Sequence, residues 1–116
     1  MKVSVVMPAK NEELVVGDVV SRISKVLPGA EVIVVNDGST DRTEDIAKGA
    51  GAIVLDLDEK TGLGNPAIAR NQGARIAGGD ILVFLDADCV PEKNWLETIV
   101  TRHREGNACV GGSLEL

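Results

Sequence analysis

The hydrophobic positions of this 116-residue chain alternate between short apolar runs and longer stretches with helical spacing. The short runs are largely β-branched, which predicts buried strands. Between them, apolar residues recur at intervals of three and four, which predicts amphipathic helices. The predicted strands cover 3–7, 32–35, 52–55, 80–85 and 108–110; the helices cover 16–27, from Ser39 or Thr40 to about 50, 66–77, and from Pro91 to about 105. This alternation predicts an α/β fold with a mostly parallel sheet and helices on both faces.

Length and composition indicate the number of domains and the kind of core. A chain of 116 residues suits one compact domain, which we expect to cover residues 1–116. Apolar residues make up 44% of the sequence, but aromatic residues only 2%. The core must therefore be aliphatic.

The charge balance excludes one large class of partner. The formal net charge is −6 and no cluster of Lys and Arg is present, so a nucleic-acid partner is not expected. A diphosphate ligand would need backbone N–H groups and a divalent cation to supply positive charge. Two cysteines, Cys89 and Cys109, form no disulfide framework, and no apolar run approaches the ~20 residues of a membrane span. We expect a cytoplasmic chain with no transmembrane segment.

Polar clusters follow three of the predicted strands. They cover residues 8–13, 36–41 and 86–88. The carboxyl ends of parallel strands meet at one edge of a sheet, and ligands of open α/β sheets bind beyond that edge. We expect the three clusters to lie together there.

Asp86 and Asp88 are the most informative pair, because they follow the apolar run 81–85 directly. Alternation along an extended segment would send both side chains the same way, so that they could share a ligand or a cation. Hard oxygen donors with no neighbouring histidine favour Mg²⁺ or Mn²⁺. The alternative is a solvated loop after a core strand, and the Asp-x-Asp motif is weak by itself.

Other polar residues carry two interpretations each. Asp37 could accept hydrogen bonds from a base or ribose, or could serve only in a turn. Arg70 could reach a diphosphate or base, or could pair with a surface acid. For His103, a packed position on the inner stripe of its helix is favoured, and Cys89 is interpreted as a small buried residue.

Four segments, taken in order, resemble glycosyltransferase family 2. They read VVMPAKNEE at 5–13, VVNDGSTD at 34–41, ARNQG at 69–73 and FLDAD at 84–88. Each motif is modest, but together they span nearly the whole chain. The resemblance implies the Rossmann-like nucleotide-binding half of a GT-A fold, which uses a nucleotide-diphosphate sugar, an acceptor that the sequence does not identify, and Mg²⁺ or Mn²⁺.

The same resemblance implies site residues. In this interpretation Asp37 contacts the base and Arg70 helps to hold the nucleotide. Asp86 lies near the ribose and the cation, and Asp88 is the metal ligand. The implied nucleotide-binding set is Pro8, Ala9, Glu12, Asp37, Arg70, Asp86 and Ala87.

Two departures from the family pattern shape these expectations. Ala9 and Lys10 stand where family members often carry an aromatic residue, so stacking of the base on that residue is lost. The acceptor-binding half and its catalytic base should follow the strand at 108–110, beyond Leu116. We therefore expect an N-terminal donor-binding fragment of a glycosyltransferase, with its catalytic base unassigned.

Two other functions agree with parts of the sequence. A truncated, non-catalytic domain would bind nucleotide or form a homodimer through an exposed sheet edge or apolar surface. A nucleotidyltransferase should carry a glycine-rich phosphate loop after the first strand, but residues 8–13 contain no glycine. It is therefore disfavoured.

Overall fold

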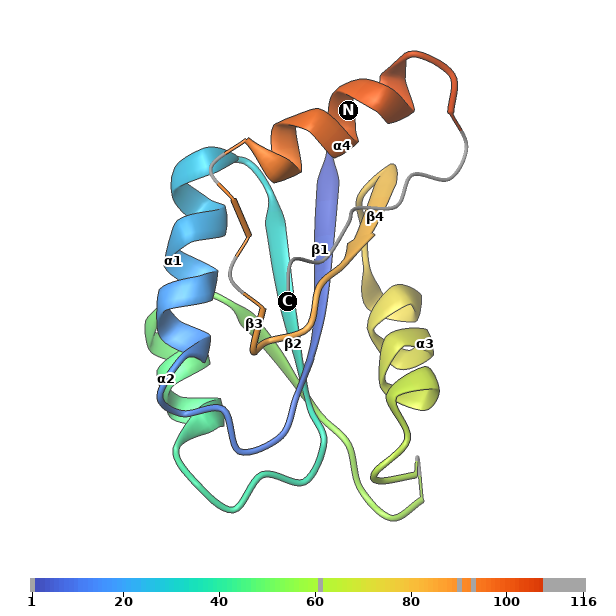
Figure 1. The fold of residues 1–116 in the computed structure, drawn as a ribbon. Helices are drawn as coiled ribbons and strands as arrows, with labels where there is room; N and C mark the ends of the chain where they lie inside the picture. Colours follow the sequence, from blue (N-terminus) through green and yellow to red (C-terminus); the bar gives the residue numbers. More distant parts are fainter. Residues whose placement is uncertain (1, 61, 90, 93, 108–116) are drawn as a thin grey trace.

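The computed structural model describes residues 2–60, 62–89, 91–92 and 94–107. Within these ranges, strands and helices alternate along the chain (Figure 1). The predicted α/β architecture is confirmed, and the strand predicted at 108–110 lies outside the described residues. The strands are β1 (Val3–Ala9), β2 (Glu31–Asn36), β3 (Ile53–Asp56) and β4 (Ile81–Phe84); the helices are α1 (Val16–Val26), α2 (Thr43–Gly49), α3 (Pro66–Ile76) and α4 (Trp95–Arg104).

The four described strands form one parallel sheet in the order β3-β2-β1-β4. β1 pairs with β2 from Ser4 to Ala9, but with β4 only from Val3 to Val6. The chain first builds the sheet to one side of β1 and then crosses to the other side to add β4. Such a reversal of strand order opens a crevice at the carboxyl ends of the strands. The reversal in this sheet falls between β1 and β4.

Helices cover both faces of the sheet (Figure 1). Val5 and Met7 of β1 belong to the buried cluster that contains residues of α1, α2 and α4. Val6 points to the other face, where it packs with Ala69 of α3. The described buried hydrophobic residues are all aliphatic, as the composition predicts. Among the described helices, none is long and apolar enough to cross a membrane.

Pro8 does not end the first strand, contrary to the sequence-based expectation. β1 continues to Ala9, and Pro8 pairs in register with Val35 of β2. Successive residues of a strand direct their N–H groups to opposite neighbours. Leu85 N–H donates to Val6 O at 3.1 Å, so the even-numbered positions of β1 face β4. The nitrogen of Pro8 therefore faces the side on which pairing has already ended, where a missing donor is tolerated.

Two helices begin later than expected. α2 begins at Thr43 instead of after Ser39 or Thr40, because Thr43 N–H donates to Asp41 Oδ1 at 2.9 Å. α4 begins at Trp95 instead of at Pro91, after a turn in which Trp95 N–H donates to Glu92 O at 3.0 Å. Both shifts leave longer polar loops at the carboxyl edge of the sheet.

Candidate nucleotide and metal site

The loops after β1 and β2 are joined by hydrogen bonds. Asp37 N–H donates to Ala9 O at 2.9 Å, which extends the β1–β2 pairing beyond β2. Asn11 N–H donates to Ser39 Oγ at 3.0 Å, and Thr40 N–H donates to Asn11 Oδ1 at 2.8 Å. Two of the predicted clusters, 8–13 and 36–41, thus form one surface at the carboxyl edge of the sheet.

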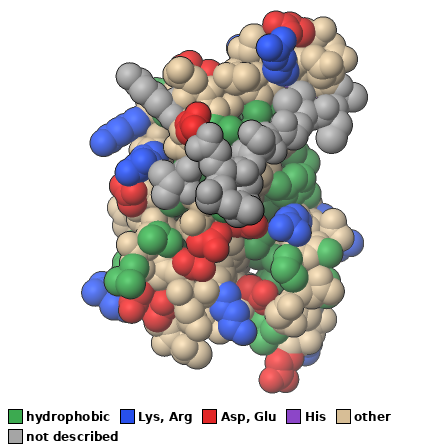
Figure 2. All heavy atoms as spheres, viewed as in Figure 1, with side chains coloured by type: hydrophobic (Ala, Val, Ile, Leu, Met, Phe, Trp, Pro, Cys, Tyr) green, Lys and Arg blue, Asp and Glu red, His purple; other side chains and the backbone are tan. Residues whose placement is uncertain are grey.

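The entry to α1 adds acidic groups to this surface. Glu12 N–H donates to Thr43 Oγ1 at 2.8 Å, and Glu13 N–H donates to Asp41 Oδ2 at 3.2 Å. Burial raises the pKa of Glu12, and the negative charges of Asp88 and Asp41 raise it further. Glu12 therefore feels the charge of Asp88, which belongs to the third predicted cluster. Figure 2 shows acidic side chains gathered in the middle of this face of the molecule.

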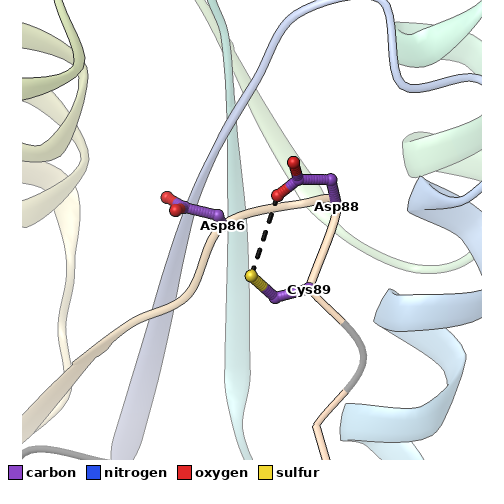
Figure 3. Close-up of side chains that lie close together, drawn as sticks. All are labelled: Asp86, Asp88 and Cys89. Atoms are coloured by element: carbon purple, nitrogen blue, oxygen red, sulfur yellow. Dashed lines mark hydrogen bonds between the residues drawn. The ribbon is translucent and has the colours of Figure 1, made fainter. Parts of the chain in front are cut away.

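Asp86, Asp88 and Cys89 come together after β4 (Figure 3). β4 ends at Phe84, and Cys89 N–H donates to Asp86 O at 3.1 Å, which closes a turn. The expected extended path through Asp88 is therefore wrong, and the turn brings the acids together instead. One carboxylate oxygen of each acid and Cys89 Sγ lie within 4.8 Å of one another. Both acids are exposed, so water and phosphate oxygens could complete the shell of a hard cation, and the donor set fits Mg²⁺ or Mn²⁺.

Asp86 also has a cationic neighbour. Figure 3 shows its carboxylate directed away from Asp88, while Asp88 and Cys89 point back toward Asp86. Arg70 Nη2 of α3 lies 3.3 Å from Asp86 Oδ1. This pair links the helix on one face of the sheet to the end of β4. It gives the acidic edge a positive charge.

The Asp37 side chain is buried, and one of its two carboxylate oxygens accepts a hydrogen bond from the described residues. Its Oδ1 accepts a hydrogen bond from Gly64 N–H at 2.9 Å. The described residues offer no partner to Oδ2. Leu63 packs beside it: a Cβ built on Gly38 would lie 3.5 Å from Leu63 Cδ2.

Gly64 and Leu63 were not predicted as site residues. The one signal for them in the sequence is the Gly-Leu-Gly run at 62–64, in which an apolar residue stands between two glycines. Gly62 and Gly64 both have positive φ, at 96° and 75°. Glycine adopts this conformation without strain, which lets the loop return to the Asp37 turn.

The remaining predicted residues differ in accessibility. Pro8 is half-buried, whereas the side chains of Ala9 and Ala87 belong to the hydrophobic core. Ala9 and Ala87 can therefore reach a ligand only through their backbone.

Cys89 and His103 are half-buried, so the expectation of a buried cysteine was too strong. Burial raises the pKa of the Cys89 thiol, and the charges of Asp88 and Asp86 add to this effect. A thiol with a raised pKa is a poor nucleophile at neutral pH.

A cavity of about 570 Å³ lies between α1 and the 91–97 segment, and none of the predicted site residues lines it.

Comparison with known proteins identifies the family. The sequence model described as glycosyl transferase family 2 matches residues 4–115. The glycosyltransferase AglE of Haloferax volcanii is 36% identical over 122 residues, covering 97% of this chain and 39% of the relative. The 4,4′-diaponeurosporenoate glycosyltransferase of Staphylococcus aureus is 34% identical over 104 residues, covering 87% of this chain and 28% of the relative.

Solved structures agree with the family match. A mycobacterial protein aligns with a TM-score of 0.77 and 36% identity, covering 91% of this chain and 38% of that one. Glucosyl-3-phosphoglycerate synthase of Mycobacterium tuberculosis, solved with Mn²⁺, UDP-glucose and phosphoglyceric acid, aligns with a TM-score of 0.74 and 32% identity. That alignment covers 90% of this chain and 40% of the synthase.

The chain spans less than half the length of these relatives. The family match, however, covers nearly the whole chain, and the all-parallel sheet agrees with the GT-A structures that it resembles. This chain belongs to glycosyl transferase family 2.

Proposed function

We propose that this chain binds the nucleotide-diphosphate sugar of a glycosyl transfer reaction, together with a divalent cation, in the crevice beyond β1, β2 and β4. The observation that carries the proposal is the meeting of Asp86, Asp88 and Arg70 at the end of β4. A cation held by the acids and a guanidinium beside them would face the same diphosphate. A structural neighbour contains UDP-glucose and Mn²⁺, which supports both the donor class and the metal.

Each group has a distinct task in this proposal. Asp88 is the principal cation ligand, and Asp86 divides its charge between the cation and Arg70. Asp37 accepts a hydrogen bond from the base through Oδ2, while the backbone of Ala9 and Ala87 and the side chains of Pro8 and Glu12 line the pocket.

When bound, the cation would neutralise the departing diphosphate as the sugar–phosphate bond breaks. Arg70 could form charge-assisted hydrogen bonds to the same phosphate oxygens, for which its planar guanidinium is suited. Deprotonation of the acceptor hydroxyl in an inverting transfer requires a general base, and we assign no residue to that task. The proposal therefore covers donor binding and not turnover.

Experiment must identify the acceptor and decide between Mg²⁺ and Mn²⁺. A cytoplasmic location is proposed from the cysteine content alone.

Calorimetry tests this proposal. We expect UDP-glucose to bind in the presence of Mn²⁺ or Mg²⁺ and to lose most of its affinity when EDTA is added. Asp88→Asn should show the same loss in the presence of the cation, whereas Asp45→Asn, an exposed acid of α2, should not. Equal binding with and without a cation would contradict the proposal.

A second candidate function, self-association, is favoured by the apolar surface of β4. Leu82 and Phe84 are 42% and 45% exposed, and the described strands leave the outer edge of β4 unpaired. An open edge beside apolar side chains is a surface on which a second copy could pair. Light scattering after size exclusion would show a dimer in the wild type that Phe84→Glu converts to a monomer. A monomer at all concentrations would contradict this candidate.

A further inference from the structure

The buried hydroxyl of Thr43 joins the turns that follow β1 and β2. Thr43 is the first residue of α2, and its side chain is fully buried. Its hydroxyl accepts the N–H of Glu12 at 2.8 Å and donates to Asp41 Oδ1 at 2.5 Å. Asp41 Oδ2 accepts the N–H of Glu13 at 3.2 Å. One hydroxyl and one carboxylate therefore hold two successive residues of the turn after β1.

The backbone of Glu12 is fixed on both sides. Thr43 holds its N–H, and its carbonyl oxygen accepts the N–H groups of Val15 and Val16 at 3.1 and 2.9 Å, where α1 begins. Its side chain therefore starts from a backbone with little freedom to move.

The residue before Glu12 has an unusual backbone conformation. Asn11 has a φ of 54°, a value that residues with a side chain seldom adopt unless their surroundings hold them there. Its N–H donates to Ser39 Oγ, and its Oδ1 accepts the N–H of Thr40. The turn after β2 thus supplies the support that this conformation needs, and Asn11 passes the chain on to Glu12 in a defined direction.

The order of the strands places Glu12 between two parts of the site. β1 lies between β2 and β4, so the turn after β1 has the turn of β2 on one side and the acids that follow β4 on the other. Glu12 is half-buried, and both burial and the charge of Asp88 raise its pKa. The carboxylates of Glu12 and Asp88 therefore repel each other, and a cation beside them would relieve that repulsion.

We propose that Thr43 is a positioning residue of the cation site: its hydroxyl fixes the turn after β1, so that the Glu12 carboxylate stands near Asp88 and adds a third negative charge to the two of Asp86 and Asp88. Glu12 acts across cation-bound water, of which Mg²⁺ usually keeps several molecules. This inference rests on the proposed function, because it assumes that Asp86 and Asp88 bind the cation.

The first test removes the charge and leaves the turn in place. Glu12→Gln keeps the backbone hydrogen bonds of the turn. It should weaken the binding of Mn²⁺ in the presence of UDP by about fivefold, because one nearby negative charge is lost. Glu97→Gln is the matched control, since it makes the same chemical change at an exposed position of α4. Calorimetric titration with Mn²⁺ measures both variants.

The second test removes the hydroxyl. Thr43→Val keeps the branched shape but leaves the Glu12 N–H without its acceptor, and it should weaken Mn²⁺ binding by about fivefold. Thr43→Ser restores the hydroxyl and should restore the affinity.

Ser4 offers a matched control for the loss of a buried hydroxyl. It is fully buried, accepts the N–H of Gly79 at 2.9 Å and donates to Glu31 Oε1 at 2.8 Å. These bonds repeat the chemistry of Thr43, but Ser4 lies near the start of β1, at the opposite edge of the sheet. Ser4→Ala should therefore lower the stability and leave the affinity for Mn²⁺ unchanged. Urea denaturation determines the stability of each variant.

A double-mutant cycle separates positioning from a general effect on the fold. If Thr43 acts through the charge of Glu12, Thr43→Val should change the affinity for Mn²⁺ by less than about twofold when Glu12→Gln is already present. A purely structural role of Thr43 would give losses that multiply.

The outcomes distinguish this inference from the proposed function. A wild type that binds no Mn²⁺ in the presence of UDP, or an Asp88→Asn variant that binds it as the wild type does, overturns both. Wild-type affinity in Glu12→Gln overturns the inference alone, whatever the stability of Thr43→Val. Multiplying losses in the double variant would also overturn it. So would a loss in Thr43→Ser or Ser4→Ala as large as that in Thr43→Val.

Discussion

Arg70 Nη2 lies 3.3 Å from Asp86 Oδ1, so α3 and the end of β4 are joined at the acidic edge of the sheet. Both side chains are more than one third exposed, and such a pair contributes little to stability. Its interest is functional, because a diphosphate that approaches Asp88 would compete with Asp86 for the guanidinium. Asp86 would then become free to turn toward a cation.

Removal of this guanidinium should weaken nucleotide binding. Arg70→Ala is expected to raise the dissociation constant for Mn²⁺-UDP by about tenfold, the loss of one charge-assisted contact. Arg70→Lys should recover part of the affinity, because it restores the charge without the planar fork. Arg102→Ala is the matched control, as it breaks an exposed ion pair between Arg102 of α4 and Glu105, just after that helix. If Arg102→Ala bound Mn²⁺-UDP as weakly as Arg70→Ala, the loss of affinity would come from the net charge of the protein and not from a contact made by Arg70.

The contact of α3 with the sheet depends on Gly73. A Cβ at this position would lie 2.9 Å from Val35 Cγ2 and still closer to Val6 Cγ1, both in the buried core. Gly73→Ala should therefore lower the free energy of unfolding by about 1–3 kcal/mol, as overpacking does.

Gly49 provides the opposite case for comparison. It ends α2, and a Cβ there would meet nothing within 4 Å. Gly49→Ala should raise the free energy of unfolding by about 0.5–1 kcal/mol through the lower entropy of the unfolded chain. Urea denaturation of both variants compares them. Equal stability changes in the two variants would contradict the close packing of α3.

The stability of the chain should fall at acidic pH through Glu31. The hydrogen bonds donated by Gly78 N–H and the Ser4 hydroxyl lower the pKa of Glu31, and the charge of Lys2 lowers it further. A carboxyl with a lower pKa in the folded state stabilises the protein above its unfolded pKa. That stabilisation is lost as the pH falls through the folded pKa.

Denaturation at a series of pH values measures this effect. Between about pH 5 and pH 3, the wild type should lose more stability than Glu31→Gln, which cannot titrate. Glu97→Gln, an exposed acid on α4, should follow the wild type. Parallel curves for wild type and Glu31→Gln would exclude Glu31 as a source of the loss.

The sequence predicts the layered fold because strand and helix periods differ clearly and because the polar clusters follow the strands. The same logic places Asp37, Asp86 and Asp88 at one edge. It misses the continuation of β1 through Pro8, since that depends on where β4 stops pairing. It also misses the contact of Gly64 with Asp37, which joins positions 27 residues apart through a loop without periodic pattern. Such contacts are set by tertiary packing and leave little trace in local composition.

The position of the cation can be measured by NMR, because bound Mn²⁺ broadens the amide signals of residues close to it. With UDP present, Mn²⁺ should broaden the signals of residues 86–89 first, followed by those at 9–12, and Asp88→Asn should abolish the effect. Broadening centred on the cavity between α1 and residues 91–97, or broadening that survives in Asp88→Asn, would contradict the proposed site.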